Sequence, residues 1–343
     1  MDRRDFLRLS AASIAGLGAL GLVGPGLHRS LAAIATEETA PVYGGWVDSL
    51  EARQNYIRQQ ARPFLDQLNQ NIRGTGKGRT VLLWPYLEKA YGHALTPHAQ
   101  EIGDCVSHAY GLGIDILTAV QLANSLVPQV WVAEAATETI YGGARVQSRV
   151  QLNGQSPIPG DGINSVNAAE FIKKFGVLLR QKYGTHDYRR YDGDVARKLG
   201  QLGVPVELLV LCKLHPVQTT AIVKSWDEAR DAVANGYPVT LASSVGFSMR
   251  RGRDQDGFLV PGRQPWYHCM LLAGIDDNAR RPGGVILNSW GSDWVEGPTR
   301  LNQPAGSFFA DASVIDRMCR QGDSIALSQY VGYPLQNIEY SLY

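Results

Sequence analysis

The chain contains three side chains whose types could together support nucleophilic catalysis: Cys105, His268 and Asn288, in that order. A thiolate is a strong nucleophile, and an imidazole within hydrogen-bond reach can take the proton from a thiol. An amide carbonyl can accept the other ring N–H of the imidazole and so fix its tautomer and orientation. The set therefore predicts acyl transfer in which Cys105 attacks a carbonyl carbon and forms a thioester.

The sequence around the first two residues predicts elements that would hold them in place. Cys105 directly precedes the run 106–123, which is hydrophobic nearly all round and is typical of a buried helix. A thiol at a helix N-terminus lies at the positive end of the helix dipole, which favours the thiolate. His268 lies at the start of an apolar strand predicted over 267–275. Such a strand holds an imidazole rigidly, as a general base requires.

Two tryptophans follow the third residue closely. Asn288 comes directly after the predicted strand 284–287 and begins the segment Asn-Ser-Trp-Gly-Ser-Asp-Trp-Val-Glu-Gly. Its tryptophans are Trp290 and Trp294. An indole beside the hydrogen bond between His268 and Asn288 would shield that bond from water, so we expect both tryptophans to cover the site.

Several segments resemble those of papain-like cysteine peptidases. The segment 288–297 matches the Asn-Ser-Trp-Gly-x-x-Trp-x-Glu-Gly motif of that family at every fixed position. The strand that begins His-Cys-Met-Leu-Leu-Ala-Gly at His268 is similar to the His-Ala-Val-Leu-Leu-Val-Gly strand of the family, and Asn-Gly-Tyr-Pro-Val at 235–239 resembles its Gly-Pro-Val strand. The resemblance extends, with gaps, from about residue 96 to residue 297.

The resemblance implies a fold, an activity and a set of site residues. The fold would be α+β, with a helical subdomain, a strand-rich and barrel-like subdomain, and the active site in the cleft between them. The activity would be hydrolysis of peptide bonds in a protein or peptide substrate, without a metal or a cofactor. Gln100 would help to hold the oxyanion. A degenerate glycine segment would line the substrate cleft, formed by Gly160, Asp161 and Gly162.

The sequence departs from the family beside the nucleophile. Gln100 lies five residues before Cys105, one fewer than usual, and Val106 replaces a tryptophan. Cys269 takes the place of an alanine. Asp104 would oppose ionisation of the neighbouring thiol and raise its pKa. A catalytically inactive scaffold or binding protein therefore stays open as an alternative, and so does a transamidating acyltransferase, which uses similar residues.

The first 35 residues have the composition of a signal peptide. Arg3 and Arg4 precede Phe-Leu, the stretch 10–23 is apolar and small, and Ala-Ile-Ala ends at Ala35. The arginine pair resembles a twin-arginine signal and predicts export to the periplasm or the exterior. A membrane anchor is the alternative, but the apolar stretch is shorter than the ~20 residues that a spanning helix needs.

The rest of the chain divides into an extension and a peptidase domain. Residues 36–95 are predicted as a helical extension and linker, with a helix over 50–72, and could be an inhibitory pro-segment or an accessory. Residues 96–343 would form the peptidase domain, helical to about 205 and strand-rich from 206. Smaller predictions are loops over 141–167, helices over 166–183, 192–202 and 225–235, and strands over 239–242 and 307–309.

Composition and local context exclude other classes of function. The 33 basic and 32 acidic residues give a net charge of +1, which offers no electrostatic attraction to nucleic acid. A zinc site built from Cys105, His108, His268 and Cys269 is disfavoured, because adjacent residues on a strand point to opposite faces. His98 is predicted at the surface, and the protein is predicted to be a monomer.

Overall fold

A computed structural model describes residues 44–59, 72–125, 130–151, 160–249 and 252–338. The predicted signal peptide, residues 1–35, lies outside the described residues, as does the second half of the helix predicted over 50–72. Within the described residues, no helix combines the length and the apolar character needed to cross a membrane.

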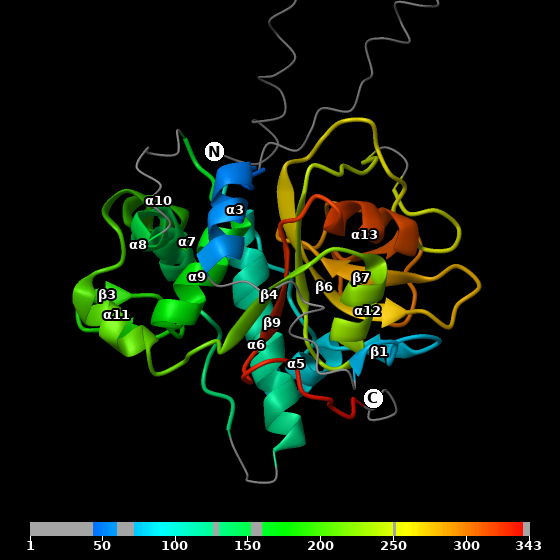
Figure 1. Cartoon of the computed structure of the whole chain (residues 1–343), viewed down its shortest axis with the longest axis horizontal. Helices are drawn as coiled ribbons and strands as arrows, with labels where there is room; N and C mark the ends of the chain where they lie inside the picture. Colours follow the sequence, from blue (N-terminus) through cyan, green and yellow to red (C-terminus); the bar gives the residue numbers. More distant parts are fainter. Residues whose placement is uncertain (1–43, 60–71, 126–129, 152–159, 250–251, 339–343) are drawn as a thin grey trace, which may run out of the picture. The chain divides into compact units, whose positions relative to one another are not determined.

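Helix α6 (Cys105–Asn124) is the central element. Every residue from Cys105 to Leu117 is buried, because the helix packs against other helices on one side and against the sheet on the other (Figure 1). Its contact with the sheet depends on Gly113, where an added Cβ would lie 2.9 Å from a methyl group of Leu327. The strongly apolar sequence after Cys105 therefore folds as predicted, as a helix inside the core.

The helices that surround α6 fall into two sets. Helices α7, α9 and α10 pack on one another, and α12 and α13 pack on the sheet (Figure 1). Asp192 caps α10 and Ser225 caps α12 by accepting main-chain N–H groups. Their bounds are α7 (Thr137–Arg145), α9 (Ser165–Phe175), α10 (Gly193–Leu202), α12 (Trp226–Ala234) and α13 (Ala312–Cys319). The others are α3 (Leu50–Gln59), α5 (Trp84–Tyr91), α8 (Gln147–Gln151) and α11 (Val206–Cys212).

One antiparallel sheet holds the strands of the second half. Its order is β4-β9-β5-β6-β7-β8, and β1 pairs with the later part of β6. The strands are β1 (Thr80–Leu82), β4 (Thr219–Val223), β5 (Val239–Ser243), β6 (His268–Asp276), β7 (Gly283–Leu287), β8 (Phe308–Asp311) and β9 (Ser324–Ser328). A separate hairpin joins β2 (Lys182–Tyr183) and β3 (His186–Asp187).

The pairing of β6 with β7 brings two predicted site residues together. Leu271 pairs with Leu287, and the strands run in opposite directions. The start of β6, at His268, therefore lies next to the end of β7, which Asn288 follows directly. Antiparallel pairing thus makes neighbours of two residues that the sequence separates by a whole hairpin.

The predicted α+β class is confirmed, but three details were wrong. The described strands form an open sheet and not a closed, barrel-like one. The range 141–167 was predicted as loops, yet it contains the end of α7 and all of α8. The helix predicted over 166–183 ends at Phe175, because Gly176 adopts a φ of +79° and an added Cβ there would lie 2.0 Å from a carbonyl oxygen.

Candidate active site

Cys105 is the first residue of α6 and is fully buried. Its Sγ accepts a hydrogen bond from the main-chain N–H of Cys269, at a distance of 3.4 Å. Cys269 is the neighbour of His268 on β6, so the thiol at the start of the helix lies against the start of this strand. The structure thus brings the predicted nucleophile and the strand of the predicted base to one place.

His268 is held by Asn288. The Nε2 atom of the imidazole lies 2.7 Å from Oδ1 of Asn288, and the same oxygen accepts the main-chain N–H of Ser289 at 2.8 Å. An acceptor at Nε2 requires the proton on that nitrogen and leaves Nδ1 as a lone pair. Among the described residues, Nδ1 of His268 has no hydrogen-bond partner. It is therefore available to take a proton from a thiol.

Three tryptophans cover the imidazole. Trp290 stacks on His268 with ring centroids 4.5 Å apart and an interplanar angle of 24°. Trp266 and Trp294 pack against Trp290 at 4.9 Å and 5.1 Å. Trp290 therefore covers one face of His268 and shields it from water, and the other two rings pack against Trp290. The role of Trp266 was missed in the sequence, although it stands only two residues before the histidine.

Gln100 lies in the same cluster. Its main-chain N–H donates to the carbonyl of Ser289 at 2.8 Å, and its Oε1 accepts the hydroxyl of Ser289 at 2.6 Å. Its Nε2 donates to the carbonyl of Ile102 at 2.8 Å. The side chain of Gln100 is therefore fixed between the segment after Asn288 and the turn before Cys105, with one amide hydrogen bonded to the main chain.

Burial favours the neutral forms of the Cys105 thiol and the His268 imidazole in this conformation. It raises the pKa of the Cys105 thiol to about 12; the N–H of Cys269 opposes this shift, and the charge of Asp104 adds to it. Burial lowers the pKa of His268 to about 4, against the effect of its hydrogen bond to Asn288. Because burial is the largest cause in both cases, exposing the site would shift both groups toward a thiolate–imidazolium pair.

Comparisons with known proteins identify the fold. No family model matches the sequence, and no curated protein matches it either. The structure of xylellain, a cysteine protease from Xylella fastidiosa, aligns with a TM-score of 0.55 and 16% identity over 85% of this chain and 98% of xylellain. Digestive procathepsin L 3 of Tenebrio molitor aligns with a TM-score of 0.48 and 12% identity, over 88% of this chain and 86% of that one. The fold is papain-like.

A short N-terminal segment, residues 44–47, passes beside the candidate site. The main-chain N–H groups of Gly45 and Trp46 donate to the carbonyl of Tyr267 at 3.2 Å and 3.1 Å. On the other side, Ile163 donates to Gly45 at 2.9 Å and accepts from Val47 at 3.0 Å. The segment is thus bonded through its main chain to Tyr267, the residue before His268, and to Ile163, the residue after the predicted glycine segment.

The fit of this segment depends on glycines. An added Cβ at Gly45 would lie 2.4 Å from the carbonyl oxygen of Gly103, two residues before Cys105. An added Cβ at Gly162 would lie 2.8 Å from a methyl group of Val47. The space between Tyr267 and Ile163 that the segment fills is called the channel below, and Gly162, predicted to line the substrate cleft, lies against Val47 at its edge.

The other two members of the predicted glycine segment lie around this channel. Asp161 accepts the main-chain N–H of Gly103 at 3.3 Å and so ties the channel wall to the turn before Cys105. Gly160 has a φ of +67°, with open space where a Cβ would be, so it serves a turn and contacts nothing in the site.

Tyr267 has a backbone conformation that bulky residues rarely adopt. Its φ is +44°, and its side chain is half exposed. Such strain is found mostly where function requires it. Here it accompanies a carbonyl that accepts two N–H groups directly beside His268. Tyr267 and Ile163 could not be predicted from the sequence, because both contribute main-chain atoms. Residue type carries no signal for such contacts.

A polar network supports the other side of Cys105. Asp104 is fully buried, and its Oδ2 accepts the hydroxyl of Tyr191 at 2.8 Å and lies 3.4 Å from Nε2 of His108. Nδ1 of His108 lies 3.0 Å from Nδ1 of His98. His98 was predicted at the surface but is half-buried in this network. The carboxyl group of Asp104, directly before Cys105, therefore has the Tyr191 hydroxyl and the His108 imidazole beside it.

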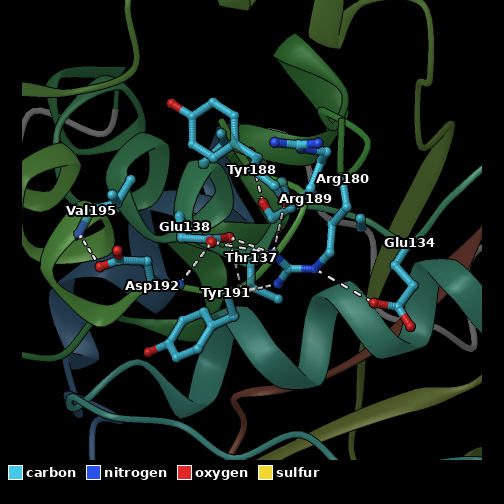
Figure 2. Close-up of polar contacts among 12 residues, drawn as sticks. Glu134, Thr137, Glu138, Arg180, Tyr188, Arg189, Tyr191, Asp192 and Val195 are labelled. Carbon is cyan, nitrogen blue, oxygen red and sulfur yellow. Dashed lines mark hydrogen bonds and ion pairs between the residues drawn. The ribbon is translucent and has the colours of Figure 1, made fainter. Parts of the chain in front are cut away.

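The loop that carries Tyr191 is itself anchored by Arg180. Figure 2 shows Arg180 between Glu134 and Glu138, with Thr137 beside it. The guanidinium lies 3.1 Å and 3.2 Å from the two carboxylate oxygens of Glu138, and one of these oxygens also accepts the main-chain N–H of Asp192 at 3.2 Å. Because Asp192 follows Tyr191 directly, this buried ion pair fixes the loop from which Tyr191 reaches Asp104.

Proposed function

We propose that the chain is a cysteine-type peptidase with Cys105, His268 and Asn288 as its triad. The observation that carries this proposal is the state of the imidazole: Nε2 is bonded to Asn288, and Nδ1 has no partner within the described residues, while the Cys105 thiol lies against the same strand. The papain-like fold, shared with a protein described as a cysteine protease, supports the same class of reaction.

The proposed reaction has two halves. Cys105 gives its proton to Nδ1 of His268, and its Sγ attacks the peptide carbonyl carbon. The main-chain N–H of Cys105 and the amide of Gln100 would stabilise the oxyanion. The C–N bond then breaks, the amine leaves with the proton from His268, and a thioester remains. A water molecule gives a proton to His268 and adds to the thioester, and Cys105 is released as the acid departs.

The setting of this peptidase is part of the proposal. The substrate would be a protein or peptide. The enzyme would be a monomer that works outside the cytoplasm, after the signal peptide predicted over residues 1–35 has directed its export. The reaction as written needs no metal and no cofactor. The residues that hold the substrate would be the main-chain groups of Tyr267 and Ile163 that the segment 44–47 now occupies.

We further propose that this segment keeps the peptidase latent. It fills the channel, and its Gly45 lies against Gly103, two residues before Cys105. Cys105 is fully buried, and burial is the main reason that the thiol and the imidazole are neutral. Part of the extension predicted over 36–95 would therefore be inhibitory, one of the two roles that the sequence left open. A chain without this segment in place would have an ionisable thiol.

Alkylation by iodoacetamide between pH 4 and pH 9 tests the proposal without a known substrate. The variant Gly45→Val, in which the new side chain meets Gly103, should react selectively at Cys105 below pH 7, and Gly45→Val/His268→Ala should lose that reaction. The buried thiols of Cys212 and Cys319 serve as internal references. Cys105→Ala should abolish hydrolysis of a casein substrate by Gly45→Val.

Two results would count against the proposal. If Cys105 in Gly45→Val reacts only above pH 8, at the rate of the reference thiols, the protein is an inactive scaffold. If the wild-type chain reacts at Cys105 as fast as Gly45→Val does, the segment does not cover the site. Gly184→Ala, which changes a glycine with a φ of +59° and open space around it, is the control for the loss of a glycine.

A further inference from the structure

We propose that Asp323 forms the floor of a substrate side-chain pocket and that the peptidase prefers lysine or arginine in the position that Trp46 now occupies. This inference rests on the proposed function, because it concerns substrates of the same site. It starts from the one large side chain that the segment 44–47 places inside the protein.

The side chain of Trp46 shows where the pocket lies. Trp46 is only 4% exposed, and its indole lies along the ring of Tyr267 with centroids 6.3 Å apart and an interplanar angle of 24°. Its main-chain N–H is one of the two bonded to the carbonyl of Tyr267. The pocket therefore opens directly from the main-chain contacts beside His268.

A carboxylate lies at the end of this pocket. Asp323, the residue before β9, is fully buried, and its Oδ2 accepts the indole N–H of Trp46 at 2.6 Å. Its Oδ1 has no hydrogen bond within the described residues. An indole has a single N–H and cannot serve both oxygens. At the polar end of the pocket, Oδ1 of Asp323 can therefore accept a hydrogen bond from a second donor.

The charge of Asp323 is only partly compensated. Burial raises the pKa of its carboxyl to about 7, although the bond from Trp46, the charge of Arg53 and the main-chain N–H of Ser165 act in the other direction. Arg53 is itself paired with Asp48. A buried carboxylate without a cation is costly, and one that meets an ammonium or guanidinium group is stabilised. Arginine could bond both oxygens of Asp323 through its planar fork, and lysine has three N–H donors.

A substrate would reach the same place through its main chain. The groups that hold the segment are the carbonyl of Tyr267 and the N–H and carbonyl of Ile163, which bond to any extended peptide whatever its sequence. Successive side chains of an extended peptide point to opposite sides, so one of them enters the pocket. An extended lysine or arginine reaches at least as far from its Cα as the indole N–H does. The side chain that enters therefore meets Asp323.

The test uses the full chain with the pocket vacated. Trp46→Ala is compared with Trp46→Ala/Asp323→Asn on a library of fluorogenic tetrapeptides in which each position is varied in turn. Every variant in this test also carries Gly45→Val, which displaces the main chain of the segment from Tyr267 and Ile163. For Trp46→Ala we expect one position to favour lysine or arginine over norleucine by about 10- to 100-fold in kcat/KM, as a hydrogen bond to a charged group provides. In the double variant this ratio should fall to about 1 to 3.

Controls separate a pocket effect from a folding defect. Trp46→Ala/Asp256→Asn changes an exposed aspartate and should keep the preference. Thermal melting checks that each variant is folded. If Asp323→Asn does not fold, Asp323→Ser provides a smaller polar group, and it too should lose the preference for lysine and arginine.

A second readout distinguishes failure of this inference from failure of the proposed function. Peptidyl acyloxymethyl ketones with lysine or norleucine at the selected position label a reactive thiol without turnover. Equal labelling of Cys105 by both probes, unchanged in the double variant, would overturn the pocket and leave the peptidase intact. If no peptide is hydrolysed and neither these probes nor iodoacetamide labels Cys105 in Trp46→Ala, the peptidase itself fails and the pocket with it.

Discussion

Two buried carboxylates lie near the candidate nucleophile, and they differ in what compensates them. Asp104 is bonded to the hydroxyl of Tyr191 and lies within 3.4 Å of His108, and both side chains belong to the main fold. Asp323 accepts a hydrogen bond from the side chain of Trp46, which belongs to the segment that passes beside the site, and the main-chain N–H of Ser165 also faces it. Asp104 therefore has side-chain partners that stay, and Asp323 has a side-chain partner that can leave.

This difference suggests different uses for the same chemical group. A carboxylate with fixed partners contributes a constant field, and here that field opposes ionisation of Cys105. A carboxylate whose partner can leave is suited to recognising what replaces that partner. The following predictions test the contrast, beginning with the largest effect.

The pH dependence of stability should reveal the charge of Asp323. Its pKa in the folded protein is about 7, above the ordinary value of 3.8, so the folded state holds this proton more tightly than the unfolded state. Its contribution to stability is therefore fully present below pH 4 and is lost as the pH rises through 7. Relative to the wild type, Asp323→Asn should gain up to about 4 kcal/mol in unfolding free energy between pH 4 and pH 8.

Urea titrations at pH 4, 6 and 8 measure this change. The charged groups facing Asp323 are Arg53 and Asp48, and the N–H groups of Trp46 and Ser165 also face it. Asp48→Asn should leave most of the pH dependence in place. A constant stability difference between Asp323→Asn and the wild type at all three pH values would count against the contrast. It would show that the charge of Asp323 is compensated to the same degree as that of Asp104.

Displacing the segment should have the next largest effect. In Gly45→Val the added side chain meets the carbonyl of Gly103, so the segment cannot remain in place. We expect alkylation of Cys105 at pH 6 to become at least about 100-fold faster, because exposure lowers the pKa of the thiol and the thiolate fraction rises as that pKa falls. The rate is measured by mass spectrometry of the labelled peptide, and an unchanged rate would mean that burial does not limit the thiol.

The residues of the candidate site are easier to find in the sequence than the residues that cover them. The Asn288 segment and the strand of His268 can be recognised because their proposed chemistry depends on side chains, which the sequence gives directly. The run after Cys105 is hydrophobic nearly all round, so it predicts a buried helix. Asp323 could not be found in this way. It joins the site because β9 pairs with β5, with Ala326 opposite Val239, and that register depends on the whole sheet.

The errors in the fold have a similar origin. The open sheet was mistaken for a barrel, because closure depends on the pairing of edge strands and not on any local pattern. Residues 137–145 form α7 despite two consecutive glycines, Gly142 and Gly143, because the helix packs tightly: an added Cβ would lie 2.6 Å from Leu199 and 2.1 Å from Phe171. Tertiary packing there overrides the low helix propensity of glycine.

Removing the charge of Asp104 should have the opposite effect on stability from removing that of Asp323. Asp104→Asn weakens the bond from Tyr191 and the contact with His108 inside the core. At pH 8 it should lower the unfolding free energy by about 1 to 3 kcal/mol, the usual cost of disturbing a buried hydrogen bond to a charged group. Urea unfolding measures both variants at this pH, and a gain in stability for Asp104→Asn would remove the contrast.

The smallest effect is expected from Tyr191→Phe, which removes one partner of Asp104 and leaves the carboxylate in place. The charge of Asp104 is then less compensated, and because that charge raises the pKa of Cys105, the thiol should ionise at higher pH. In the Gly45→Val background, alkylation at pH 6 should slow by about 3- to 10-fold, and the rate should recover as the pH rises past the new pKa. Tyr183→Phe removes a hydroxyl bonded to a main-chain carbonyl elsewhere in the helical part and should change nothing. A slower rate at every pH would mean that Tyr191 acts on the position of Cys105, since a purely electrostatic effect disappears once the thiol is fully ionised.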